Sequence, residues 1–184
     1  MPNNFFPLSA EELVKRINKI PKVNLATLPT ALEYMPNISK ELEINLYIKR
    51  DDCTALAFGG NKTRHLEFIL AKAVSGNYDC IITGASSQSN WCRQTVAAAN
   101  KLNLESFLVV MHGVKGKSMQ GNFLLYNILG ANVDVVDGED LEEIPIHLEK
   151  KYKELIKKGR KPLLINGGFG KEDSVLAGIS YANA

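Results

Sequence analysis

The chain has 184 residues, of which 45% are hydrophobic and 23% charged, and its formal net charge is +2. This composition is ordinary for a globular protein with one core, or with one domain and part of another. Nucleic-acid binding usually needs a basic stripe, and none is present. The one basic run, residues 150–162, has apolar residues at helical spacing and is interpreted as a solvated helix end.

The cysteines and the apolar residues exclude further classes of protein. Cys53, Cys80 and Cys92 give neither a disulfide framework nor the spacing of a metal site, so we expect reduced thiols, no metal and a cytoplasmic protein. No stretch approaches eighteen consecutive apolar residues, and no signal peptide is recognisable, so no membrane association is expected.

The N-terminal third contains one clear helix signal. Ser9 followed by Glu12 forms a capping box, which predicts a helix that Pro21 ends. The next stretch, 24–39, contains two prolines and is predicted to be extended or looped. Residues 44–52 alternate apolar and polar side chains, which predicts a strand.

From about residue 63 onward, helices and strands alternate. Helices are predicted over 63–76, 90–102, 118–129 and 141–158, and strands begin near 80, 106, 133 and 163. A strand spacing near thirty residues is that of a β-α-β unit. The sequence therefore predicts an α/β fold with an open, parallel, four-stranded sheet and flanking helices.

This arrangement of strands predicts where the functional residues lie. In open α/β sheets, ligands bind beyond the carboxyl ends of the strands. The loops after Thr83 and after Ile165 are therefore the expected places for a site. A last helix, from about Lys171, would present Val175, Leu176 and Ile179 as an apolar stripe.

Lys62 stands in the segment "GGNKT", directly before a predicted helix. The P-loop signature fails at two positions, and no dinucleotide fingerprint follows the first sheet strand. Two interpretations stay open from the residues alone. Lys62 is either a solvated loop charge or a reactive amine, which Gly59 and Gly60 would allow a flat ligand to approach.

The segment Ser86, Ser87, Gln88, Ser89, Asn90 lies between a strand end and a helix start. The exposed N–H groups of a helix N-terminus suit a carboxylate or a phosphate. One Ser or Asn would be enough to cap the helix. Five consecutive hydrogen-bonding side chains exceed that need and favour a binding loop.

The segments "IKRDDCTALAFGGNKTRHLEF" and "TGASSQSNWCRQ", in this order and spacing, resemble the family of 1-aminocyclopropane-1-carboxylate deaminase and D-cysteine desulfhydrase. These are fold-type II enzymes that use pyridoxal 5′-phosphate. The resemblance runs from about Asn24 to the end of the chain. It implies a lyase or deaminase that converts a small amino acid into ammonia and a 2-oxo acid.

The resemblance also implies roles for single residues. Lys62 would form a Schiff base with the cofactor and later act as a base, and Ser89 would be a second catalytic group. The cofactor would be bound by Lys62, Asn61, His65 and Asn90, and the substrate by Ser86, Ser87, Gln88, Ser89, Asn90 and Trp91.

Two positions depart from the family pattern. His65 stands where the family usually has a basic residue, often a lysine, near the cofactor phosphate, and Trp91 stands where it usually has Gln or His. These departures favour an alternative, a non-catalytic subunit that keeps the fold and serves as an assembly partner. Trp91 could equally be packed in the core. A nucleotide-binding module is a third, less favoured interpretation.

Chain length gives a last expectation. By resemblance, 1–64 would be the N-terminal part of a large cofactor domain, 65–165 a small α/β domain, and 166–184 the start of the return into the large domain. Family members run well beyond this length. A second chain is therefore expected to supply the C-terminal half, in a hetero-oligomer.

Overall fold

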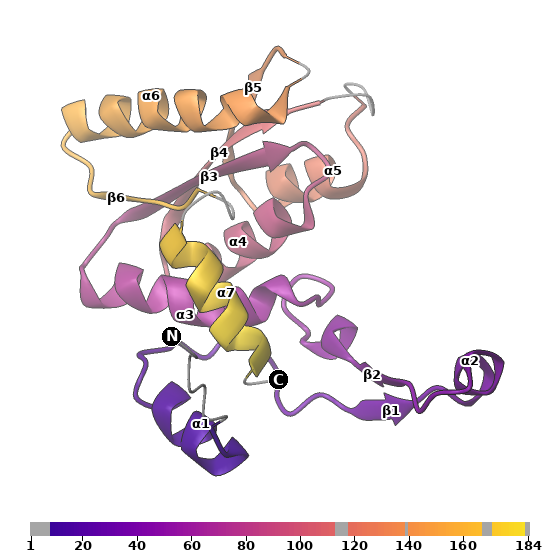
Figure 1. Cartoon of the computed structure of the whole chain (residues 1–184). Coiled ribbons are helices and arrows are strands. Elements are labelled where there is room, and N and C mark those ends of the chain that lie inside the picture. Colours follow the sequence, from indigo (N-terminus) through magenta and orange to yellow (C-terminus); the bar gives the residue numbers. More distant parts are fainter. Residues whose placement is uncertain (1–7, 113–117, 139, 167–170, 183–184) are drawn as a thin grey trace, which may run out of the picture.

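The computed structural model describes residues 8–112, 118–138, 140–166 and 171–182. Its centre is a parallel four-stranded sheet in the order β5-β4-β3-β6, with helices on both sides (Figure 1). The strands are β3 (Cys80–Ser86), β4 (Glu105–Met111), β5 (Asn132–Val136) and β6 (Pro162–Leu164). The predicted α/β fold is confirmed.

Helices α3 (Lys62–Ser75), α4 (Asn90–Lys101) and α5 (Gly121–Ile128) follow the predicted rhythm. Gln120, at the N-cap position of α5, is extended at φ −147° and ψ 168°. For this reason α5 begins later than predicted. The helix expected over 141–158 is a 3-10 turn, η3 (Leu141–Glu143), followed by α6 (Ile144–Lys157).

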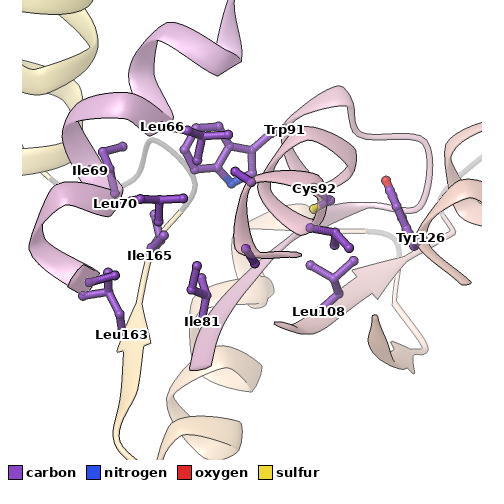
Figure 2. Packing of buried hydrophobic residues seen from close by; sticks show 14 of the residues in the cluster. Leu66, Ile69, Leu70, Ile81, Trp91, Cys92, Leu108, Tyr126, Leu163 and Ile165 are labelled. Atoms are coloured by element: carbon purple, nitrogen blue, oxygen red, sulfur yellow. The ribbon is translucent and has the colours of Figure 1, made fainter. Parts of the chain in front are cut away.

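Side chains that alternate along the central strands divide the core into two layers. Ile81 and Leu108 pack with α3, α4 and α5 in one cluster (Figure 2). Ile82 and Val109 point to the opposite face and pack against α6. The sheet thus lies between helices, and its carboxyl ends carry the loops that the sequence analysis singled out.

The N-terminal segment forms α1 (Ala10–Ile17) and then an arm. One half of the predicted capping box is confirmed, because the Ser9 side chain accepts a hydrogen bond from the Glu12 N–H at 3.2 Å. The Glu12 carboxylate instead accepts from Arg16. No helix in the described ranges has the length and apolar character to cross a membrane.

The arm consists of β1 (Leu32–Tyr34), α2 (Pro36–Leu42) and β2 (Tyr47–Lys49), and it extends away from the sheet domain (Figure 1). The two strands pair antiparallel. The prediction of loop over 24–39 was wrong for α2. Pro36 occupies the first turn of α2, where a helix needs no backbone N–H. The strand predicted over 44–52 is shorter, and the 3-10 turn η1 (Asp51–Cys53) follows it.

The last described helix, α7 (Lys171–Ala182), packs against α3. The expected site loop after Ile165 lies mostly outside the described residues, as do 113–117 of the loop after β4 and residue 139. The division at residues 64 and 165 stays a prediction.

Candidate functional site

Lys62 begins α3 at the end of a loop with an unusual backbone. Ala57 and Phe58 have φ angles of 45° and 69°, and Gly59 and Gly60 follow with 70° and 129°. Left-handed conformations in residues other than glycine cost about 1–3 kcal/mol each and cluster at functional sites. The loop therefore holds a strained shape that ends at the partly exposed Lys62.

Gln94, on α4, holds the end of this loop through hydrogen bonds. Its side-chain Oε1 accepts hydrogen bonds from the Thr63 N–H and the Thr63 hydroxyl, both at 2.8 Å. Gly60 has a φ angle of +129°, which disfavours any residue with a side chain, and a Cβ there would lie 2.5 Å from Gln94 Nε2. Gln94 thereby ties the first turn of α3 to the helix that follows the serine-rich loop.

Arg64 holds the other side of the loop. Its guanidinium donates to Asp51 Oδ1 and to Thr30 Oγ1, each at 2.9 Å. The Arg64 side chain is 4% exposed and that of Asp51 is 15% exposed. The Asp51 carbonyl also accepts from the Gly60 N–H at 2.8 Å, so this ion pair braces the loop that leads to Lys62.

His65 lies one turn below Lys62 and is buried, at 6% exposed. Its Nε2 atom has no hydrogen-bond partner. The Tyr181 ring of α7 meets the imidazole edge to face, with ring centroids 4.7 Å apart. Asn61 donates its side-chain amide to the Tyr181 hydroxyl.

Burial, together with the smaller effect of the nearby Lys62 charge, lowers the pKa of His65 to about 4, and Asp51 opposes this shift. The imidazole is therefore neutral at pH 7. The side chain at this position is therefore a buried, neutral imidazole in place of the basic residue that the family usually has.

This pKa predicts an acid-dependent loss of stability. An unfolded imidazole takes up a proton near pH 6.5, but the folded one does so only near pH 4. Between these values the unfolded state binds more protons, so the free energy of unfolding falls as the pH is lowered through this window. The full cost at pH 4 is about 3 kcal/mol.

The variant His65→Gln has no imidazole to protonate. Between pH 7 and pH 4, its free energy of unfolding is expected to fall by about 3 kcal/mol less than that of the wild type. Urea unfolding at a series of pH values measures the difference. Parallel stability curves for the two proteins would show that His65 does not titrate in this way.

The loop after β3 forms the second part of the site. The Ser89 hydroxyl caps α4 by accepting from the Cys92 N–H at 3.3 Å. The Ser89 carbonyl accepts from the Tyr126 hydroxyl of α5 at 2.8 Å, and its N–H donates to Ser86 O at 3.0 Å. Ser87 is fully buried, and its hydroxyl has no partner.

Arg93 joins the two loops. Its guanidinium donates to the Gly59 carbonyl at 3.2 Å and to Asn90 Oδ1 at 2.9 Å. Together with Gln94, it connects the glycine-rich loop before Lys62 to the segment 86–90. The structure thus links the two motifs that the sequence analysis had only placed in order.

Trp91 lies away from this polar surface. It is 9% exposed and belongs to the apolar cluster (Figure 2). Its indole N–H donates to Thr83 Oγ1 at 2.9 Å. Its assignment as a substrate contact stays a prediction, and the packing interpretation accounts for its surroundings.

The structure adds five residues that sequence reasoning missed: Arg93, Gln94, Asn122, Tyr126 and Tyr181. Two of them directly follow the "QSNWC" segment and could have been noticed there. The others come from α5 and α7, so only the fold brings them to the site. Among the described residues, no group of three His, Cys, Asp or Glu is arranged to hold a metal ion. The catalytic and binding roles of the predicted residues stay predictions.

Comparison with known proteins gives consistent matches. Residues 23–182 match the family described as "Pyridoxal-phosphate dependent enzyme". A putative 1-aminocyclopropane-1-carboxylate deaminase of Pyrococcus horikoshii is 42% identical over 151 residues, which are 82% of this chain and 45% of the relative. A D-cysteine desulfhydrase of Klebsiella pneumoniae is 37% identical over 145 residues, which are 74% of this chain and 44% of the relative.

A solved structure agrees with the sequence matches. The crystal structure of an ACC deaminase homologue superposes with a TM-score of 0.82 at 38% identity, over 92% of this chain and 50% of that one. The chain therefore spans about half the length of the relatives that it matches.

Proposed function

Because this chain belongs to the family of pyridoxal-phosphate dependent enzymes, we propose that it is the lysine-bearing half of a lyase or deaminase. Its substrate is a small amino acid, and its products are ammonia and a 2-oxo acid. The proposal rests on one observation above all. Lys62 ends a strained loop that Arg93 and Gln94 connect to the polar segment 86–90.

The residues present fit the cofactor of this family. Pyridoxal phosphate offers an aldehyde, a phenolic oxygen and a phosphate. Lys62 supplies an amine for the aldehyde carbon, and Asn90 supplies an amide for the phenolic oxygen. His65 Nε2 and the Ser87 hydroxyl are buried polar atoms without partners, and such atoms need hydrogen bonds. His65 is the candidate for the phosphate.

When bound, the cofactor supplies an electron sink for the substrate's α-carbon. The chain supplies the other functions. Where the substrate has a hydrogen on this carbon, as D-cysteine does and 1-aminocyclopropane-1-carboxylate does not, Lys62 Nζ would accept the proton that leaves it. The neighbouring Arg64 serves the structure instead, because its guanidinium is paired with Asp51. The N-terminus of α4, with Ser89 as its cap, offers N–H groups and a positive dipole end to the substrate carboxylate.

We propose in addition that a further α/β segment, on a separate chain, covers the arm in the assembled protein. Several large apolar side chains of the arm are exposed: Leu32, Tyr34, Leu42, Ile44 and Tyr47. Such a patch favours burial in an interface. Native mass spectrometry of the protein from its own cells should show this chain bound to a different one. Homomultimers alone would contradict this assembly.

The test of the proposed activity is a product assay on the assembled protein loaded with pyridoxal phosphate. D-cysteine, 1-aminocyclopropane-1-carboxylate and other small amino acids are supplied separately, and ammonia and 2-oxo acid are measured. At least one substrate should yield both products in equal amounts. If none is converted although cofactor is bound, the non-catalytic subunit is the better description.

A further inference from the structure

Asn122, in the first turn of α5, makes four hydrogen bonds to the polar loop and its helix. Its backbone N–H donates to Gln88 Oε1 at 3.0 Å. Its side-chain Nδ2 donates to the Gln88 carbonyl at 2.7 Å and to Asn90 Oδ1 at 2.9 Å. Its Oδ1 accepts from Arg93 at 2.9 Å.

Gly121 allows this close approach. Its φ angle is +54°, and a Cβ there would lie 2.5 Å from Gln88 Oε1. Gln88 also donates its amide to the Gln120 carbonyl at 3.1 Å. The start of α5 is thus bonded to Gln88 at Gln120 as well as at Asn122.

The chemistry of Arg93 fixes which way the two asparagine amides point. A guanidinium only donates hydrogen bonds. Both Asn90 and Asn122 must therefore turn their oxygens toward Arg93. The NH₂ group of Asn122 then donates to Gln88 O and Asn90 Oδ1. Asn90 Oδ1 therefore accepts two hydrogen bonds, one from Asn122 and one from Arg93.

The side-chain NH₂ group of Asn90 is available to a ligand. Its residue is exposed, and within the described part of the chain no acceptor meets its Nδ2. We propose that Asn122 is a positioning residue, which acts with Arg93 to hold the Asn90 amide with its NH₂ group directed at the ligand. In the proposed function, on which this inference rests, that ligand atom is the phenolic oxygen of the cofactor.

The variant Asn122→Asp tests this role with little change of shape. It keeps the backbone N–H and the oxygen that meets Arg93. It replaces the NH₂ group by an oxygen, which repels the carbonyl oxygens of Gln88 and Asn90. The Asn90 amide is then expected to turn away from the ligand.

Asn127→Asp is the matched control. It makes the same amide-to-carboxylate change on the same helix, where the Asn127 amide donates to Phe123 O at 2.8 Å. Neither atom belongs to the network around Asn90. Both variants are compared with the wild type in the assembled protein, after circular dichroism has established that they are folded.

Two readouts are taken. The first is the pair of side-chain NH₂ signals of Asn90 in nuclear magnetic resonance without cofactor, which should move in Asn122→Asp but not in Asn127→Asp. The second is a titration with pyridoxal phosphate. Asn122→Asp should bind it about tenfold or more weakly, as expected for a lost hydrogen bond to a charged oxygen.

The pH titration of the visible absorption band separates positioning from mere weakening. A donor to the phenolic oxygen favours its deprotonated form. Without that donor, the midpoint of the titration should move up by about one pH unit.

If Asn122→Asp melts at a temperature well below those of the wild type and Asn127→Asp, Asn122→Ala takes its place with the same expected changes.

The outcomes distinguish this inference from the proposed function. Cofactor affinity and midpoint equal to the wild type in Asn122→Asp would overturn the positioning role. If the wild type itself shows no visible absorption band that depends on Lys62, the proposed function fails. The side-chain NH₂ signals of Asn90 then test the positioning role alone. Unchanged signals overturn the inference, and shifted signals support positioning for another ligand.

Discussion

Replacing Lys62 by alanine is expected to lower kcat by at least about a thousandfold and to abolish the visible absorption of bound cofactor. The loss follows from two functions of one atom. Lys62 Nζ is proposed to hold the aldehyde carbon of the cofactor and then to accept the substrate's proton. Steady-state kinetics and a spectral titration with pyridoxal phosphate measure the two effects.

Two further variants show whether charge or chemistry matters. Lys62→Arg keeps the positive charge but offers no amine that attacks a carbonyl, so it should be as inactive as Lys62→Ala. Lys72→Ala changes a lysine in the last turn of the same helix, and it should keep wild-type kinetics. Activity of Lys62→Ala within about tenfold of the wild type would exclude the proposed role.

Replacing Arg64 by methionine should lower the free energy of unfolding by about 3 kcal/mol or more. The reason is the carboxylate that remains. Asp51 is only 15% exposed, and without its partner it would be a buried charge with no counterion. The Thr30 hydroxyl would lose its donor as well. Urea unfolding at pH 7 measures this loss.

The matched control is Arg160→Met. Arg160 also bonds two carboxylates, Asp79 at 2.9 Å and Glu105 at 2.7 Å, but its side chain is 30% exposed. Water replaces a surface ion pair well, so this loss should be about 1 kcal/mol or less. Equal losses for the two variants would mean that burial does not set the strength of the Arg64 pair.

Much of the fold could be predicted because its signals are local. The Ser9 N-cap and the glycine that ends α3 lie within a few residues of the helices whose ends they mark. The missed helix α2 is an instructive failure. Pro36 was taken as a sign of loop, whereas its position at the helix start suits a proline.

The candidate site was predictable only in part. The motifs identified Lys62 and the segment 86–90, but not what holds them. Asn122 reaches Gln88 across 34 residues of sequence, and no local pattern announces such a contact. Likewise, His65 packs against Tyr181 of α7, a contact between residues far apart in the sequence that its neighbours in the chain do not announce.

The most direct test of the central claim is to locate the lysine that carries the cofactor. Borohydride makes a bond between pyridoxal phosphate and a lysine permanent, and mass spectrometry of the digested protein then identifies the modified peptide. The proposed function predicts that the label lies on Lys62 and is absent from Lys62→Arg. A label on a different lysine, or a fully assembled protein that takes up no label, would contradict it.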